Sequence, residues 1–209
     1  MSKYEYLIEN EANLTSPLVE GETLIWSSKP KKNAFIINKV LAMMPFALLW
    51  LAFDSTFIIA AIASGDIGEM LFFIIPFFAL HLMPVWIWLG NVLTASKRWK
   101  NTKYYVTDRR IIIQTGFADM NYQTIYYKDI KNVNLTIGLI DKMLDVGDIY
   151  FELSSYTTKG DSRAFLDIEQ PHEIYPKLQK IVLDIQTDMH YPNALRPDEN
   201  PGYNTKYTI

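Results

Sequence analysis

The stretch MLFFIIPFFALHLMPVWIWL, residues 70–89, determines where this chain is expected to reside in the cell. It contains one polar side chain, His81, and no charged residue. About 20 residues, rising about 1.5 Å each in an α-helix, are enough to cross the hydrocarbon core of a bilayer. The sequence therefore predicts a transmembrane helix at about residues 70–92, which places the whole protein at a membrane.

A second apolar stretch, VLAMMPFALLWLAF at residues 40–53, precedes the first. It is too short to span a bilayer, so its helix must extend in one direction. One interpretation runs from about 36 to 62 and buries Asp54, and the other runs from about 34 to 53. We favour the first, because residues 57–63 are too apolar for a solvated loop. Three prolines are expected to kink these helices: Pro45, Pro76 and Pro84.

The two segments predict a transmembrane hairpin at residues 34–95. Its connecting turn, SGDIGE at residues 64–69, has two acidic residues and no basic one. Basic residues flank the open ends of the hairpin: Lys29, Lys31, Lys32, Lys39, Lys97, Arg98, Lys100 and Lys103. Basic residues near helix ends stay cytoplasmic. We therefore expect a multi-pass protein of the cell (inner, cytoplasmic) membrane with both termini in the cytoplasm.

Two polar residues, Asp54 and His81, fall within the predicted spans. Counted from the turn, they lie within about one helical turn of each other in depth. Polar groups inside a membrane suggest a functional role, so an intramembrane Asp54–His81 pair is one hypothesis. The alternative, which we favour, is that each pairs with a backbone carbonyl, a neighbouring subunit or interfacial water.

The remaining composition excludes several classes of protein. The 209-residue chain contains no cysteine, which rules out disulfides, thiolate catalysis and zinc–sulfur sites. Residues 1–33 are polar, so we expect no cleavable secretory signal but a cytoplasmic segment with a candidate strand at 22–28. Net charge is −3, and the basic residues adjoin the predicted membrane helices, so we expect no nucleic-acid binding.

Short β-strands dominate the chain after the hairpin. Residues rich in aromatic and β-branched side chains alternate with turn residues, which predicts strands at 104–106, 111–114, 123–127, 131–137, 149–155 and 163–168. A helix follows, with Ile174, Leu178, Ile181 and Ile185 on one apolar face. We therefore predict a mainly β, α+β domain at residues 97–188, built as an antiparallel sandwich or open barrel. Residues 189–209 are expected to form a flexible tail.

Three stretches carry a resemblance to the bacterial pleckstrin-homology-like (PH-like) membrane protein family, formerly a domain of unknown function. They are LVEGETLIWSSKP at 18–30, YYVTDRRIIIQTG at 104–116, and residues 127–151, which end in DVGDIYF. Relatives often have glycine where Asp145 stands. The resemblance implies two packed antiparallel sheets with a C-terminal helix and no established activity.

Motifs for catalysis are missing from the sequence. It contains no HExxH motif, no G-x-S-x-G elbow and no glycine-rich phosphate loop. Asp141, Asp145 and Asp148 lie close together but lack the order of a known calcium loop, so we interpret them as solvated turn acids. We therefore predict no catalytic residue, no cofactor and no metal site. An enzyme or enzyme subunit acting on lipids remains an alternative, as does a transport accessory or small channel component.

Charge is unevenly distributed along the predicted domain. Residues 97–110 hold six basic residues and one acidic residue, whereas residues 111–188 hold seven basic and twelve acidic ones. Because anionic headgroups attract nearby cations, we expect headgroup contact at Lys31, Lys32, Lys97, Arg98, Lys100 and Lys103. The alternative is that these residues only orient the helices. Of the two turn arginines, Arg109 and Arg110, one is expected to pair with an acid such as Asp108 or Asp129.

These observations favour a non-enzymatic, membrane-anchored interaction or scaffold module. Its β-rich domain is expected to lie at the inner face of the membrane. There it would bind a protein partner, a second copy of itself or anionic lipid headgroups. The sequence does not decide among these three.

Overall fold

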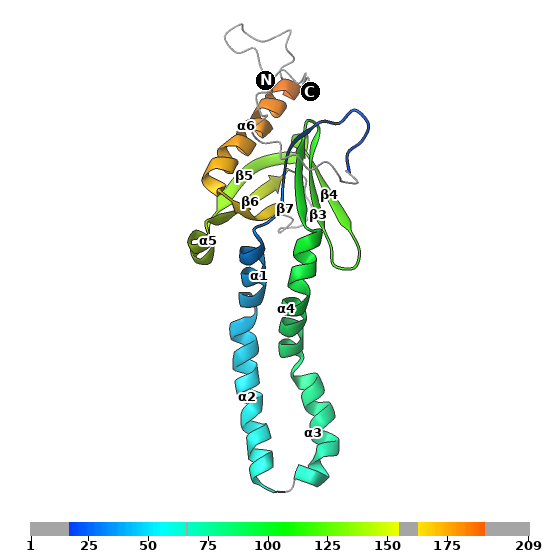
Figure 1. Ribbon diagram of the computed structural model, residues 1–209, viewed down its shortest axis with the longest axis vertical. Helices are drawn as coiled ribbons and strands as arrows, with labels where there is room; N and C mark the ends of the chain where they lie inside the picture. Colours follow the sequence, from blue (N-terminus) through cyan, green and yellow to red (C-terminus); the bar gives the residue numbers. More distant parts are fainter. Residues whose placement is uncertain (1–16, 66, 155–162, 191–209) are drawn as a thin grey trace. The chain divides into compact units, whose positions relative to one another are not determined.

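A computed structural model describes residues 17–65, 67–154 and 163–190 of the chain (Figure 1). The predicted tail, apart from its first two residues, and most of the predicted N-terminal segment lie outside these ranges, as does one residue of the turn, Asp66. The chain forms two compact units. The first comprises Met1–Ala34 and Arg98–Ile209, and the second comprises Phe35–Lys97.

A four-stranded antiparallel sheet forms one half of the first unit. Its order is β1 (Leu24–Ser28), β2 (Lys103–Thr107), β3 (Arg110–Thr115) and β4 (Asn121–Tyr126). β1 precedes the helical unit in the chain and β2 follows it, yet the two strands pair, with Trp26 opposite Val106. Residues 24–28 therefore belong to the domain that the later strands build, and the second unit is an insertion between two neighbouring strands.

A three-stranded antiparallel sheet forms the other half. Its order is β5 (Ile130–Thr136), β6 (Val146–Leu153) and β7 (Arg163–Glu169). Two short elements connect the strands, η2 (Tyr127–Asp129) before β5 and α5 (Leu139–Leu144) before β6. The long helix α6 (Pro171–His190) follows β7 and contacts β5 and β6 (Figure 1). The two sheets and the C-terminal helix confirm the predicted antiparallel domain, whereas the transmembrane hairpin stays a prediction.

Aromatic and aliphatic side chains of both sheets and α6 form one core. The predicted apolar face of α6 points into it, with Leu178, Ile181 and Ile185 each no more than 3 % exposed. Tyr104 of β2 links the two sheets, because its hydroxyl accepts the Leu166 N–H of β7 at 3.0 Å and donates to the Leu166 carbonyl at 3.3 Å. Burial raises the pKa of Tyr104 well above its ordinary value. The sheets are therefore joined by hydrogen bonds as well as by apolar packing.

Four helices make up the second unit. They are α1 (Lys32–Leu41), α2 (Met44–Ala63), α3 (Ile67–His81) and α4 (Met83–Asn101). The start of α1 and the end of α4 extend beyond the bounds of this unit into the first unit. The expected helix at 36–62 is thus interrupted before Met44, and Pro45 stands in the first turn of α2. Because proline has no N–H and its ring clashes with the carbonyl four residues earlier, an unbroken helix through this position is unfavourable.

The expected helix at 70–92 is also divided. It consists of α3 and α4, which are bent by 55° where the chain passes Leu82, just before Pro84. In hydropathy and length, the segment Lys32–Ala63, which comprises α1 and α2, is sufficient to cross a membrane. The bent pair meets the same criterion only when it is counted as one span.

Candidate functional site

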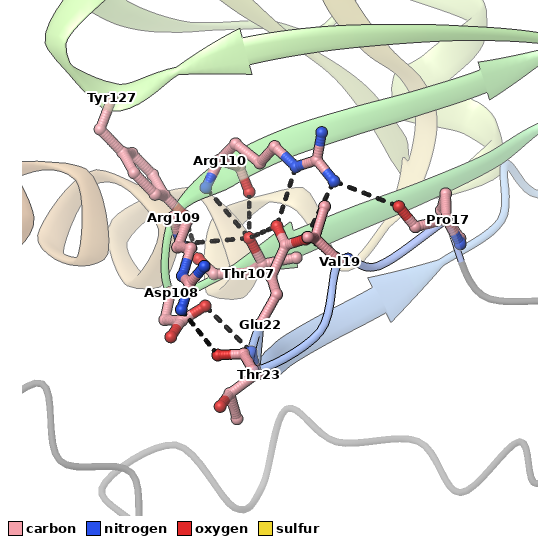
Figure 2. Close-up of polar contacts among 10 residues, drawn as sticks. Pro17, Val19, Glu22, Thr23, Thr107, Asp108, Arg109, Arg110 and Tyr127 are labelled. Carbon is pink, nitrogen blue, oxygen red and sulfur yellow. Dashed lines mark hydrogen bonds and ion pairs between the residues drawn. The ribbon is translucent and has the colours of Figure 1, made fainter.

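The turn between β2 and β3 binds the segment that precedes β1, as Figure 2 shows. Arg110 donates two hydrogen bonds to the Glu22 carboxylate, from Nε and Nη2, each 2.9 Å long. The Thr107 hydroxyl donates to the same carboxylate at 2.7 Å. Asp108 accepts the Thr23 N–H at 3.0 Å and its own N–H donates to the Thr23 carbonyl. We call these five residues the turn clamp.

The turn clamp has a buried negative charge at its centre. The Glu22 side chain is 1 % exposed. Burial by itself raises the pKa of Glu22, but hydrogen bonds from Arg110, the Val19 N–H and Thr107 outweigh it and lower the pKa to about 2. The hydrogen bond to Glu22 raises the pKa of Arg110 in turn. One turn arginine does pair with an acid, as predicted, but the acid is Glu22 rather than Asp108 or Asp129, because the pairing of β1 with β2 brings Glu22 close.

Lysines from two separate parts of the chain gather around one pocket of the first unit. The pocket has a volume of about 300 Å³ and is lined by Ser27, Ser28, Lys29, Pro30, Lys31, Lys32, Trp99, Lys103, Tyr105 and Glu169. We call it the lysine pocket. Of the six residues expected to contact headgroups, the structure brings Lys31, Lys32 and Lys103 together here and adds Lys29. The other three, Lys97, Arg98 and Lys100, are not among its lining residues.

Hydrogen bonds fix the walls of the lysine pocket. The Trp99 indole donates to the Pro30 carbonyl at 2.7 Å, and the Lys31 N–H donates to the Asp167 carbonyl at 2.8 Å. The Lys31 ammonium donates to the Leu144 carbonyl at 2.8 Å and lies 3.6 Å from Glu169. The Lys32 ammonium lies over the Trp99 ring, 5.4 Å from its centroid. The segment between β1 and α1 is therefore held in one place by partners from three other elements, α4, α5 and β7.

A second concave surface lies between the edge strand β5 and α6. This groove has a volume of about 500 Å³ and is lined by Ile130, Lys131, Asn132, Val133, Asn134, Tyr175, Pro176, Gln179, Lys180, Val182, Leu183 and Gln186. Its lining includes two lysines and no carboxylate. Gln186 donates to the Ile130 carbonyl at 2.7 Å, and Tyr175 donates to the Val133 carbonyl at 3.2 Å. Side chains of α6 thus occupy part of the edge that β5 would offer to an added strand.

The second unit holds the predicted polar residues side by side. His81 Nδ1 lies 3.0 Å from each carboxylate oxygen of Asp54, whose side chain is 1 % exposed. Trp50 donates to the His81 carbonyl at 2.8 Å, and the Phe77 ring stacks on the imidazole. An apolar hollow of about 360 Å³ borders the pair. The structure brings Asp54 and His81 into contact, and a functional role for that contact stays a hypothesis.

The three acids of α5, its C-terminal end and the start of β6 have structural roles. Asp141 caps the start of α5 by accepting the Gly138 N–H at 2.9 Å. Asp148 accepts the Asp167 N–H at 2.9 Å. Asp145 ends α5 in the left-handed region, with φ 51° and ψ 53°. In the part of the chain that the structure describes, no three His, Asp or Glu side chains form a group suited to a metal ion.

Two packed antiparallel sheets that share a core with a C-terminal helix define a PH-like domain. The chain belongs to the bacterial PH domain family, whose model matches residues 40–182. The matched range includes α2, α3 and α4 as well as β2 to β7, whereas β1 lies outside it. Domains of this class are typically non-catalytic interaction modules.

A solved structure is also similar to the chain. It is a DUF1696 family protein with a pleckstrin-homology domain from Shewanella loihica PV-4, with 14 % sequence identity and a TM-score of 0.32. The similarity covers 42 % of this chain and 73 % of that one. The comparison with curated proteins found no match.

Sequence reasoning missed Glu22, Lys29 and the residues of the β5–α6 groove as parts of sites. The "GE" lead-in was noticed as a sequence pattern, but no local signal indicates that its glutamate faces Arg110. Glu22 lies just before β1, and Arg110 lies just after the turn between β2 and β3. Their contact can be predicted only when β1 is known to pair with β2.

Proposed function

We propose that this protein is a non-enzymatic interaction module, anchored in the cell membrane by its helical unit and presenting the PH-like domain at the inner face. Both termini would then be cytoplasmic. The domain would bind a protein partner, a second copy of the chain or anionic headgroups. The observation that carries the proposal is the insertion of apolar helices between β1 and β2, because it tethers one sheet to those helices at two neighbouring strands.

Exposure of apolar side chains supports the anchoring. In the Lys32–Ala63 segment, only 11 % of the most apolar stretch is buried within the protein. Phe72 and Phe73 of α3 are 82 % and 75 % exposed. Exposure of such an apolar surface to water is unfavourable, whereas lipid chains would cover it. The helices of a soluble core would instead bury these residues.

The charges at the two ends of the helices support the orientation. The turn after α2 is acidic in sequence, and the ends that join the PH-like domain are basic, with Arg98 and Lys100 in the last turn of α4. Lysine and arginine are retained on the cytoplasmic side. The PH-like domain would then lie inside the cell.

The β5–α6 groove supports binding of a protein segment. It combines the exposed apolar side chain of Leu183 with two lysines, Lys180 and Lys131, of which Lys131 lies 3.5 Å from Glu152. Such a lining suits a segment with apolar and acidic side chains. Because Tyr175 and Gln186 already bind carbonyls of β5, the segment would be held through its side chains rather than as a complete added strand.

Single cysteines test the anchoring and the orientation, because the native chain contains none. A membrane-impermeant maleimide added to intact cells should label Ser64→Cys in the turn after α2. It should label Lys142→Cys in α5 only after the membrane is permeabilised. Labelling of Lys142→Cys in intact cells would contradict the orientation. Release of the protein by carbonate would contradict the anchoring.

Photo-crosslinking tests the interaction. A photoreactive amino acid at Gln179, an exposed residue of the groove, should capture a partner chain or a second copy in native membranes. The same probe at the exposed Lys128, which does not line the groove, is the matched control. Equal capture at both positions would show that the groove is not the binding surface.

A further inference from the structure

We propose that the first unit contacts the bilayer directly, through two apolar tips whose side chains insert among the lipids. The α5 tip consists of Leu139 and Met143. The turn tip consists of Phe117 and Met120, in the turn between β3 and β4. None of these four residues belongs to the turn clamp, the lysine pocket or the β5–α6 groove.

The first argument is the exposure of the α5 tip. Leu139 and Met143 are 83 % and 82 % exposed, more than any other large apolar side chain among the described residues of the first unit. Phe72 of α3, for which lipid contact is proposed above, is also 82 % exposed. Because contact with water is unfavourable for apolar side chains, a neighbouring pair that is so open indicates an apolar partner.

The second argument is the orientation of α5. Residues 139 and 143 are four positions apart, so they share one face of the helix. Asp141 falls on the opposite face, where it is 8 % exposed and accepts the Gly138 N–H at 2.9 Å. α5 therefore buries an acid and exposes two apolar side chains. This is the reverse of the pattern expected for a helix that lies between an apolar core and water.

The third argument is the place of the α5 tip in the first unit. At the end of α5, the Leu144 carbonyl accepts the Lys31 ammonium at 2.8 Å. Lys31 directly precedes α1, and the first three residues of α1 still belong to the first unit. The α5 tip is therefore held beside the point where the chain leaves the first unit for the apolar helices (Figure 1).

The turn tip lies beside the point where the chain returns. The guanidinium carbon of Arg98, the first residue after the helical unit, is 5.9 Å from the centroid of the Phe117 ring. The Asn101 side-chain amide donates to the Phe117 carbonyl at 3.3 Å. Phe117 is 37 % exposed and Met120 is 58 % exposed. A second, independent apolar surface thus adjoins the same connection.

The choice of lipid as the partner rests on the anchoring proposed above. The Trp99 indole donates to the Pro30 carbonyl at 2.7 Å, so the chain leaves and re-enters the first unit at one place. If the helices cross the bilayer, that place lies within a few residues of it. Apolar faces of peripheral helices enter a bilayer to a depth of about 5–10 Å. The charged neighbours of the tips, Asp119 and Lys142, are exposed and can remain among the headgroups.

The test uses the full-length protein in nanodiscs and single cysteines, because the native chain contains none. An environment-sensitive dye is attached to Leu139→Cys, Met143→Cys or Met120→Cys, and lipids that carry a nitroxide close to the headgroup act as quenchers. Leu183→Cys is the matched control, since Leu183 is an apolar residue of the first unit, 61 % exposed and outside both tips. Phe72→Cys in α3 reports separately on the anchoring.

Insertion predicts that the lipid nitroxide quenches the dye at all three tip positions at least half as strongly as at Phe72→Cys, and leaves Leu183→Cys unquenched. Quenching at Phe72→Cys alone would keep the anchoring and overturn the proposal. Quenching at the tips without Phe72→Cys would overturn the anchoring and support the tip contact. Quenching at one tip only, or equally at Leu183→Cys, would overturn the two-tip contact. A dye that is shielded at the tips but unquenched would indicate a protein partner and overturn it too.

A second measurement keeps the dye away from the tips, because an apolar dye can itself favour lipid. Energy transfer from a donor on Lys128→Cys, an exposed position, to acceptor-labelled lipid reports how close the first unit lies to the bilayer. Leu139→Glu/Met143→Glu should lower the transfer, whereas Leu183→Glu should leave it unchanged. All three positions are exposed, so the substitutions leave the core intact. Equal transfer with and without the α5 substitutions would overturn the proposal.

Discussion

Neutralising Glu22 should destabilise the PH-like domain by about 1–2 kcal/mol at neutral pH. The change is Glu22→Gln, which keeps the shape of the side chain and removes its charge. The difference between the ordinary pKa of 4.5 and a pKa of about 2 corresponds to about 3 kcal/mol. That value is a ceiling, because the Arg110 side chain is 17 % exposed and solvent screens the pair. Charged hydrogen bonds of this kind contribute about 1.5–3 kcal/mol in other proteins.

The effect has a defined pH dependence. Because the pKa of Glu22 is lower in the folded state than in the unfolded state, its contribution is present above pH 4.5. This contribution is lost as the pH falls from 4.5 toward 2, where the Glu22 carboxylate becomes protonated in the folded state as well as in the unfolded state. The difference in stability between the native protein and Glu22→Gln should therefore narrow across this range.

Thermal unfolding of the full-length protein in detergent, measured at pH 7 and at about pH 3.5, checks both expectations. Glu20→Gln is the control, because it removes the same charge from an exposed position on the same segment. The stabilising role of the Glu22 charge is refuted if Glu22→Gln and Glu20→Gln have equal effects at pH 7. It is also refuted if the deficit of Glu22→Gln is as large at the lower pH as at pH 7.

Three further substitutions test other parts of the structure. Tyr104→Phe should cost about 1–2 kcal/mol of unfolding free energy, because Leu166 loses the hydroxyl that binds both its N–H and its carbonyl. An unchanged melting temperature would contradict this role. Asp145→Gly should stabilise the domain by about 0.5–1 kcal/mol, since glycine adopts φ 51° without strain, whereas Asp145→Ala should bring no gain. His81→Ala should lower stability in detergent by about 3 kcal/mol, because it leaves the buried Asp54 carboxylate without its partner, and Asp54→Asn should lower it much less. Equal losses for these two variants would argue against pairing.

Periodicity and turn residues were sufficient to predict most of the PH-like domain. Alternating aromatic and β-branched side chains located β2 to β7, and the spacing of Leu178, Ile181 and Ile185 located the buried face of α6. Such signals are local, so a single sequence contains them. α5 was not predicted, because a helix of six residues is too short for helical periodicity to be recognised.

Contacts between distant segments were beyond the sequence. Glu22 and Arg110 are far apart in the chain, and only the pairing of β1 with β2 brings them together. The same pairing gathers Lys29 with Lys103, so the headgroup residues were predicted as a strip along the sequence rather than as a pocket. In the helical unit, by contrast, local signals were sufficient: apolar runs predicted the helices, and Pro45 and Pro84 predicted the breaks that the structure shows before Met44 and near Leu82.

The separation of β1 from β2 has a consequence for biosynthesis. About 75 residues lie between them, which a ribosome needs roughly 4–15 s to translate. During that interval the first strand has no neighbour, and the sheet cannot nucleate around it. Completion of the domain therefore has to wait until the intervening helices have emerged and the chain has returned. A truncated product that starts after the helices would leave the hydrogen-bonding edge of β2 uncovered and prone to aggregation.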